Sequence, residues 1–121
     1  MKKVVLIVED EPALRRALRR ILLREEYHVS EVACVEAALS VIAERETLDV
    51  VLTDYDLPDG LGDEVVRAAQ ARGVPVVMMT GGNKRAPAGV ALLEKPFELD
   101  AMIAKLSEVV GSAIATPPLA K

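Results

Sequence analysis

The sequence predicts an α/β fold: a doubly wound, five-stranded parallel sheet with helices on both faces. Apolar runs of strand length alternate along the chain with segments whose apolar residues recur at helical spacing. The runs are continuous in Val, Ile and Leu, as in strands that are buried on both faces. Strands that alternate with helices are joined by right-handed crossovers, which makes the sheet parallel. At 121 residues the chain has the length of one domain.

Local signals support each expected element. Pro12 suits the first position of a helix, and Gly73 ends the third helix. Polar positions alternate through residues 28–33, which predicts a strand at an edge of the sheet. The expected strands cover residues 3–8, 28–33, 49–53, 74–79 and 90–93, and the expected helices cover residues 12–24, 35–45, 61–71 and 98–110. The domain is predicted to occupy residues 1–110, followed by a flexible tail over residues 111–121.

The composition excludes several classes of protein. Apolar residues make up 51% of the chain, yet no stretch approaches the length of a membrane span. A net charge of −4 and 2% aromatic residues are evidence against nucleic-acid binding. We interpret the basic run of Arg15, Arg16, Arg19 and Arg20 as the solvated side of a helix. The single cysteine, Cys34, cannot form an internal disulfide, so a cytoplasmic location is expected.

Polar side chains follow four of the five predicted strands at the same end. Glu9 and Asp10 follow the first strand, Asp54 the third, Thr80 the fourth and Lys95 the fifth. In a parallel sheet these ends meet at one edge, where open α/β sheets bind ligands. Three carboxylates at one edge must either shift a pKa upward or acquire a cation, and their hard oxygen atoms suit Mg²⁺. The metal and Lys95 would then hold the oxygens of a phosphoryl group, with the Thr80 hydroxyl as a further donor.

These residues stand in four short motifs, which resemble those of the receiver domain of bacterial two-component response regulators. The motifs are Val8-Glu9-Asp10-Glu11, Asp54-x-x-x-Pro58 with Gly62, Thr80-Gly81 and Lys95-Pro96-Phe97. They occur in the right order at the ends of the right strands, and the resemblance covers about residues 3–110. It implies the flavodoxin-like strand order 2-1-3-4-5, which the handedness rules alone do not fix.

The resemblance also implies a signalling function rather than an enzyme that acts on other molecules. Asp54 would be the phosphoacceptor, which takes a phosphoryl group from a phosphohistidine on a sensor histidine kinase or a histidine phosphotransfer protein. Lys95 would contact the phosphoryl group, and Thr80 would move toward it as the switch. The domain would then catalyse only its own phosphorylation and dephosphorylation.

The metal ligands carried over from the family are carboxylates and one carbonyl. Asp10 and Asp54 would bind Mg²⁺ directly, Glu9 would act largely through water, and the backbone carbonyl of Asp56 would complete the protein ligands. The Asp56 side chain occupies the position at which the family tunes the rate of its own dephosphorylation.

The sequence departs from the family in two places. Leu92 stands where most receivers have an aromatic residue that rotates inward when the threonine moves. The segment from Thr80 to Lys95 is short and contains Gly82, Pro87 and Gly89, so the usual fourth helix is not expected. We expect residues 81–89 to carry the signal instead. No output domain follows residue 110, so the domain is expected to act through another chain, with a homodimer as one option, or to be part of a larger protein.

Three alternatives remain open from the residues alone. A receiver-like scaffold would bind a partner without ever being phosphorylated. A haloacid-dehalogenase-type phosphatase would use Asp54-x-Asp56 as nucleophile and acid, although that motif normally closes the first strand and the chain is too short for a substrate cap. A dinucleotide-binding module is disfavoured, since no Gly-rich turn follows the first strand.

Overall fold

The computed structural model describes residues 2–82 and 86–115 of the chain. Within that part, the main sheet contains β1 (Val4–Val8), β2 (His28–Val32), β3 (Val50–Asp54), β6 (Val76–Thr80) and β7 (Ala91–Glu94). The helices are α1 (Pro12–Arg24), α2 (Val35–Glu44), α3 (Gly62–Ala71) and α4 (Leu99–Ala115). A short antiparallel hairpin, β4 (Asp56–Leu57) and β5 (Gly60–Leu61), follows β3. None of the helices in the described ranges is long and apolar enough to cross a membrane.

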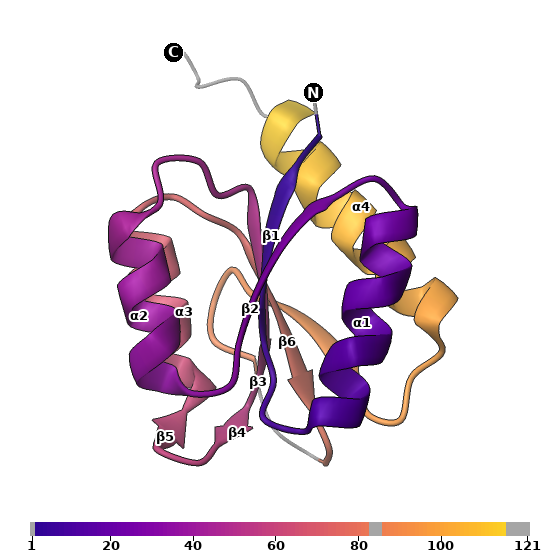
Figure 1. Ribbon diagram of the computed structural model, residues 1–121. Coiled ribbons are helices and arrows are strands. Elements are labelled where there is room, and N and C mark those ends of the chain that lie inside the picture. Colours follow the sequence, from indigo (N-terminus) through magenta and orange to yellow (C-terminus); the bar gives the residue numbers. More distant parts are fainter. Residues whose placement is uncertain (1, 83–85, 116–121) are drawn as a thin grey trace.

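The sheet is parallel throughout and has the strand order β2-β1-β3-β6-β7. This is the 2-1-3-4-5 order expected for a flavodoxin-like fold, so the predicted fold class is confirmed. Figure 1 shows α1 and α4 on one face of the sheet and α2 and α3 on the other. The strand over residues 28–32 lies at an edge, as its alternating pattern predicted.

The three central strands are buried along their whole length, which explains their continuous apolar sequences. Successive side chains of a strand point to opposite faces, and each face has its own hydrophobic core. Leu6 and Met78 pack with α2 and α3, whereas Ile7 and Met79 pack with α1 and α4. The two cores fix the register of the sheet, because a slip by one residue would exchange the faces.

The amino end of α2 is capped from a distant part of the chain. Cys34, the residue before the helix, makes no capping hydrogen bond with its side chain. Instead, the carboxylate of Asp59 accepts hydrogen bonds from the backbone N–H groups of Val35 (2.7 Å) and Glu36 (3.0 Å). Asp59 belongs to the turn between β4 and β5, so this turn is attached to α2.

The carboxyl end of α2 is held in a similar way. Arg72, which follows α3, donates hydrogen bonds from its guanidinium to the backbone carbonyls of Ile42 and Arg45, the latter at 2.7 Å. A cation at this end of a helix interacts favourably with the helix dipole. Both ends of α2 are therefore stabilised by residues that come later in the sequence.

The structure differs from the sequence expectations at several boundaries. The β4–β5 hairpin was not predicted. The last helix was expected to end at Val110, but it continues to Ala115 through Gly111. Met102, Leu106 and Val110 are buried in the core, and their packing holds the helix beyond the point where local propensity predicted its end. The part of the predicted tail beyond Ala115 lies outside the described residues.

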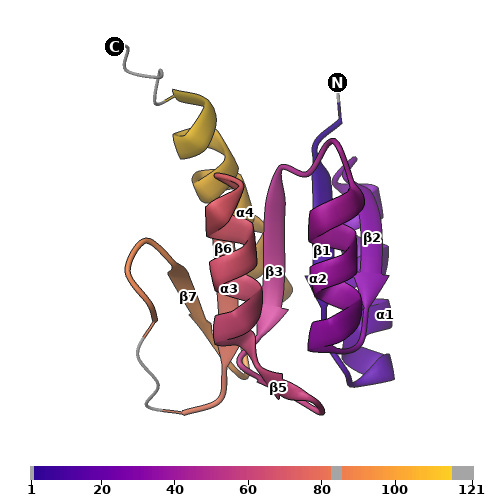
Figure 2. The same ribbon diagram turned by 90° about the vertical axis from the view of Figure 1, so that its left-hand side faces the viewer.

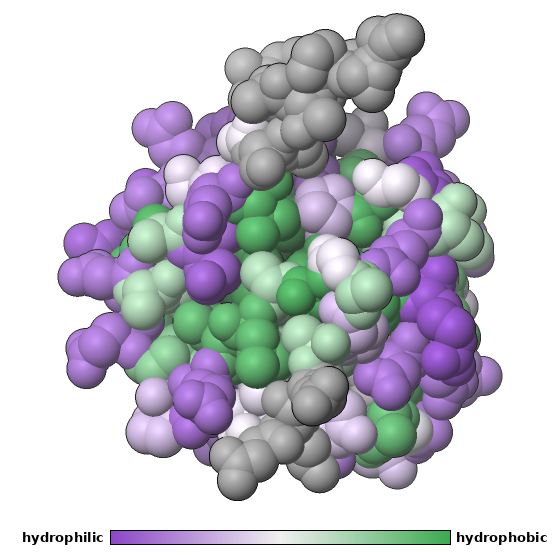
Figure 3. All heavy atoms as spheres, turned by 180° about the vertical axis from the view of Figure 1, so that it is seen from behind, coloured by the Kyte–Doolittle hydropathy of each residue, from purple (hydrophilic) through white to green (hydrophobic). Residues whose placement is uncertain are grey.

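The connection from β6 to β7 contains no helix within its described residues, as expected. Gly81 and Gly82 form a bend, and Ala88 and Gly89 form a turn, whereas residues 83–85 lie outside the described ranges. The Gln70 side chain of α3 donates a hydrogen bond to the Ala88 carbonyl at 2.9 Å. Figure 2 shows the described residues 86–90 of this connection on the outer side of β7, at the edge of the sheet. On the face opposite to that of Figure 1, apolar residues gather near the middle and polar residues surround them (Figure 3).

Candidate functional site

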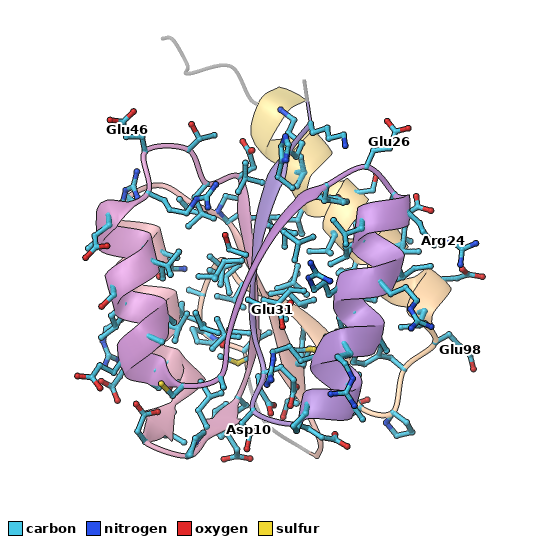
Figure 4. All side chains as sticks on the ribbon, in the orientation of Figure 1. Asp10, Arg24, Glu26, Glu31, Glu46 and Glu98 are labelled. Atoms are coloured by element: carbon cyan, nitrogen blue, oxygen red, sulfur yellow. The ribbon has the colours of Figure 1, made fainter. Side chains whose placement is uncertain are left out.

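The carboxyl edge of the sheet gathers the polar residues that the sequence singled out. Glu9 follows β1 and is only 1% exposed, while Asp54, the last residue of β3, is 8% exposed. Asp10 lies next to Glu9 with its side chain exposed, at the lower end of the sheet in Figure 4. One carboxylate oxygen from each of Glu9, Asp10 and Asp54 lies within 4.8 Å of the others. The three predicted carboxylates therefore form one cluster.

Lys95 joins two of these carboxylates. Its ammonium Nζ lies 3.1 Å from Oε1 of Glu9 and 3.3 Å from Oδ2 of Asp54. The backbone N–H of Lys95 donates to the Thr80 carbonyl at 2.7 Å, which attaches the end of β7 to the end of β6. Lys95 is followed by a cis peptide bond to Pro96. One cation thus serves two buried anions.

The electrostatics of the cluster reflect this shortage of positive charge. Burial raises the pKa of Glu9, and the nearby charge of Asp54 raises it further. The hydrogen bond from the Glu11 backbone and the interactions with Lys95 act in the opposite direction, but the pKa remains raised. Burial also raises the pKa of Asp54, although the charge of Lys95 opposes it. Burial alone would lower the pKa of Lys95, but its hydrogen bonds and charge interactions with the two carboxylates leave that pKa raised. A further cation would relieve the cluster.

The Thr80 hydroxyl is the second sign that the site accommodates something more. Thr80 is 1% exposed, and its Oγ1 has no hydrogen-bond partner among the described residues. A buried polar atom without a partner costs about 1–3 kcal/mol, so such atoms need an explanation. Thr80 is the last residue of β6, the strand beside β3, whose last residue is Asp54.

The chain around Asp54 is packed closely enough to require glycine at position 62. A Cβ atom on Gly62 would collide with the backbone carbonyl of Asp54 and crowd Met78. The N–H of Gly62 donates to the Tyr55 carbonyl at 2.7 Å, and the N–H of Tyr55 donates to the Met79 carbonyl at 2.8 Å. These contacts fix the start of α3 against the end of β3 and so hold the Asp54 backbone in place.

Comparison with known proteins agrees with this geometry. The family model described as the response regulator receiver domain matches residues 5–107. This chain belongs to that family. It is a receiver domain, homologous to the response regulators of two-component systems.

Among curated relatives, this receiver is 36% identical over 110 residues to the KDP operon transcriptional regulatory protein KdpE of Escherichia coli, covering 84% of this chain and 48% of that protein. It is 31% identical over 114 residues to the TorCAD operon transcriptional regulatory protein TorR of the same species, covering 88% of this chain and 49% of TorR. The chain thus spans about half the length of these two relatives.

Solved structures of receivers have the same fold. A response regulator receiver protein from Sinorhizobium medicae matches with a TM-score of 0.87 at 22% identity, covering 93% of this chain and 97% of that one. A CheY-like receiver domain protein from Methanospirillum hungatei matches with a TM-score of 0.83 at 28% identity, covering 94% and 98% of the two chains.

Two further residues singled out in the sequence, Asp56 and Leu92, lie outside the three-carboxylate cluster. Asp56 lies in β4, with an exposed side chain and Leu61 opposite it across the hairpin; its carboxylate is not part of the three-residue cluster. Leu92 lies in β7 opposite Met78 and is partly buried against the core that faces α2 and α3.

Sequence reasoning missed two residues that shape this edge. Glu11 donates its backbone N–H to Oε2 of Glu9 at 3.0 Å. The basic run was interpreted as the solvated side of a helix, and Arg16, Arg19 and Arg20 are exposed as expected. The interpretation is wrong for Arg15, whose guanidinium Nη1 donates to the Glu9 backbone carbonyl at 2.8 Å. Arg15 directly follows Leu14, which belongs to the apolar stripe of α1. This position beside the stripe was the available signal that the Arg15 side chain could lie against the sheet.

Proposed function

We propose that this receiver is a phosphoacceptor switch in which Asp54 accepts a phosphoryl group from a phosphohistidine. The donor would be a sensor histidine kinase or a histidine phosphotransfer protein. The observation that carries the proposal is the cluster itself, in which a buried carboxylate at the end of the central strand shares one lysine with another carboxylate. The buried Thr80 hydroxyl at the adjacent strand end, which has no partner in the part of the chain that the structure describes, adds support.

In the proposed reaction an Asp54 oxygen attacks the phosphorus atom of the phosphohistidine. A new P–O bond forms as the P–N bond breaks, and the electron pair of that bond leaves with the imidazole. The product is an acyl phosphate on Asp54. Since the phosphoryl group brings negative charge, Lys95 has a role beyond its present contacts: its Nζ, already 3.3 Å from Asp54, can donate to a phosphoryl oxygen.

Glu9, Asp10 and Asp54 fit a magnesium ion, because they present clustered hard oxygen atoms with a deficit of positive charge. Together with the Asp56 carbonyl, these residues would hold it. Bound Mg²⁺ would supply positive charge that neutralises phosphoryl oxygens during transfer. This fit rests on the donor set and on the raised pKa values of the two buried carboxylates.

The phosphorylated state would be transmitted through Thr80. Its hydroxyl has no partner to give up among the described residues, so donating to a phosphoryl oxygen costs no existing hydrogen bond. Leu92 lacks the aromatic ring that most receivers use at this position, so the motion would pass to the bend at Gly81 and Gly82 instead. Residues 83–85 of the same connection lie outside the described ranges.

A groove beside the site offers a place for the donor. It has a volume of about 430 Å³, and its lining residues are Glu11, Leu14, Lys95, Pro96, Phe97 and Leu99. Apolar side chains from α1 and from the start of α4 thus lie directly next to the lysine of the site. A helix of the donor could bury apolar residues there while its phosphohistidine reaches Asp54. The domain, which the sequence predicted over residues 1–110 and whose last helix continues to Ala115, would act in the cytoplasm.

Stoichiometric phosphorylation tests the proposal. Wild-type protein incubated with acetyl phosphate and MgCl₂ should gain one phosphoryl group by intact mass, and Asp54→Asn should gain none. Asp56→Asn is the matched control: it changes an exposed carboxylate in the same segment and should still be labelled. Full labelling of Asp54→Asn would rule out the acceptor. An unlabelled wild type would favour an unphosphorylated scaffold, and continuous release of phosphate from a small phosphoester would favour a phosphatase.

A further inference from the structure

Arg15 connects the carboxylate cluster to the neighbouring strand. Its Nη1 donates to the Glu9 backbone carbonyl at 2.8 Å, and its Nε donates to Oε1 of Glu31 at 3.1 Å. Arg19, one helical turn further along α1, forms an ion pair with the other oxygen of Glu31 at 2.9 Å. In Figure 4, Glu31 of β2 lies between that strand and α1. Two arginines therefore bind one carboxylate, but only Arg15 also reaches Glu9.

With the bond to Arg15, every polar atom of Glu9 has a hydrogen-bond partner. Its N–H donates to the Val32 carbonyl, and its side-chain oxygens accept from Lys95 Nζ and the Glu11 N–H. The fourth atom, the backbone carbonyl oxygen, is held by Arg15. These four partners come from different positions along the chain, so both the backbone and the side chain of Glu9 are held by hydrogen bonds.

Asp10 is constrained in a different way. Its exposed carboxylate has no hydrogen bond or ion pair within the part of the chain that the structure describes. Its backbone, however, begins at the peptide group whose oxygen Arg15 holds. A peptide group is planar, so fixing the Glu9 carbonyl also fixes the direction of the Asp10 N–H and the start of the Asp10 residue.

We propose that Arg15 is a positioning residue for metal binding, which orients the Glu9–Asp10 peptide so that both carboxylates face Asp54. The inference rests on the proposed function, because it concerns the same magnesium site. The hydrogen bonds of Arg15 go to the Glu9 carbonyl and to Glu31, and none goes to a carboxylate of the cluster. Arg15 acts through a backbone carbonyl, in the manner of residues that hold a metal ligand from behind.

The sign of the expected effect separates positioning from simple charge. Arg15 is a cation near a site for a cation, so its removal would strengthen Mg²⁺ binding if only long-range electrostatics were at work. Loss of positioning acts in the opposite direction, because Asp10 would have to be ordered at the moment of binding. A weaker affinity after removal of this positive charge is therefore evidence of geometry.

Arg19 provides the matched control. It has the same charge, lies on the same helix and binds the same Glu31, but it is 54% exposed, whereas Arg15 is 21% exposed. Both substitutions weaken the attachment of α1 to β2. Only the substitution at Arg15 removes the hydrogen bond to the Glu9 carbonyl.

The test is a titration of metal-free protein with MgCl₂. The amide chemical shifts of Asp54 and Tyr55 in NMR spectra report the binding of Mg²⁺. Arg15→Met, which keeps an unbranched apolar stem, should bind Mg²⁺ about tenfold more weakly than wild type. Arg19→Met should stay within about twofold of wild type, since exposed ion pairs contribute little. Arg15→Lys should fall between wild type and Arg15→Met, because one nitrogen cannot fill the places of both Nε and Nη1.

Each outcome has a distinct meaning. Wild-type binding with an equal or stronger affinity in Arg15→Met would overturn the role of Arg15 and leave the proposed function intact. Equal weakening in Arg19→Met would overturn it as well, because the effect would then come from the attachment of α1. A wild type without Mg²⁺-dependent shifts would overturn the magnesium site and the positioning role together. If Arg15→Met does not give a native amide spectrum, an unchanged affinity in Arg15→Lys would overturn the proposal.

Discussion

Asp54 and Asp59 lie in one short segment of the chain, but the fold treats their carboxylates in opposite ways. Asp54 is buried at the end of β3, where burial raises its pKa, and it shares Lys95 with Glu9. Asp59 is exposed, and backbone hydrogen bonds from Glu36 and Val35 lower its pKa. The first carboxylate is held in a place that disfavours its charge, and the second in a place that favours it.

The difference separates a reactive position from a structural one. A carboxylate whose hydrogen-bond partners are already supplied by the protein has little to gain from a ligand. A buried carboxylate with too little neighbouring positive charge gains from a cation or from covalent modification. Perturbed pKa values of the second kind are a mark of functional sites when geometry agrees, and here the three-carboxylate cluster and the Thr80 hydroxyl do agree.

The largest expected effect comes from disturbing the backbone that holds the Asp54 carboxylate. Gly62→Ala would push a Cβ atom into the Asp54 carbonyl, which is backbone and cannot move aside alone. We expect a loss of about 1–3 kcal/mol in unfolding free energy, as for other overpacked positions, together with slower phosphorylation. Urea unfolding and labelling by acetyl phosphate would measure the two. Gly111→Ala, at a helical glycine with no atom within 4 Å of the added Cβ, is the control and should be neutral or stabilising.

A smaller effect, of opposite sign, is expected when the crowded cluster loses a charge. Asp10→Asn should raise the metal-free unfolding free energy by about 1 kcal/mol. This is less than the ~4 kcal/mol for two unit charges 4 Å apart at a dielectric constant of 20, because Asp10 is exposed. The same variant should bind Mg²⁺ more weakly. Thermal melts in EDTA and a MgCl₂ titration check both halves, and a lower metal-free melting temperature would refute the repulsion argument.

The smallest effect is the response of each carboxylate to pH. The pKa values of Glu9 and Asp54 are raised above 4.5 and 3.8, so their contribution to stability is present below those values and is lost as pH rises through the raised pKa values. The pKa of Asp59 is lowered below 3.8, so its contribution is present above that value and is lost as pH falls.

The unfolding free energy of metal-free protein, measured from below to above the ordinary pKa values of these carboxyl groups, would distinguish the two directions of pH dependence. Asp54→Asn should reduce the loss of stability on raising the pH, and Asp59→Asn should reduce the loss on lowering it. The same slope change in both variants would mean that the two carboxylates do not differ as described.

The sheet and the cluster could be predicted from repeated local patterns and from strand ends that meet at one edge. The strand order was predicted only through the resemblance to receiver domains. The sequence could not predict the partners of Asp59 and Arg15. The partners of Asp59, Val35 and Glu36, lie far back in the sequence, so no local pattern around Asp59 indicates them. Arg15 was assigned to solvent by its charge, whereas its contact with Glu9 depends on how α1 packs against the sheet.

Element ends were the other limit. Asp54 and Thr80 were placed just after their strands, but both belong to the strands, because they are paired with Met79 and Glu94. Pairing is a property of two segments and is invisible in either one alone. The last helix was expected to end at Val110, but the local cost of Gly111 is small compared with the packing of the preceding turns, and α4 continues to Ala115.

The capping of α2 has a consequence for how the domain is made. The helix has 10 residues, too few for stability on its own, and Asp59 and Arg72, which stabilise its two ends, are synthesised after it. A ribosome delivers the chain from its amino end, so β1, α1 and β2 emerge before either partner exists. We therefore expect α2 to stay unformed on a nascent chain until α3 has been released, so this half of the domain gains protection from proteases only well after its own residues have been synthesised.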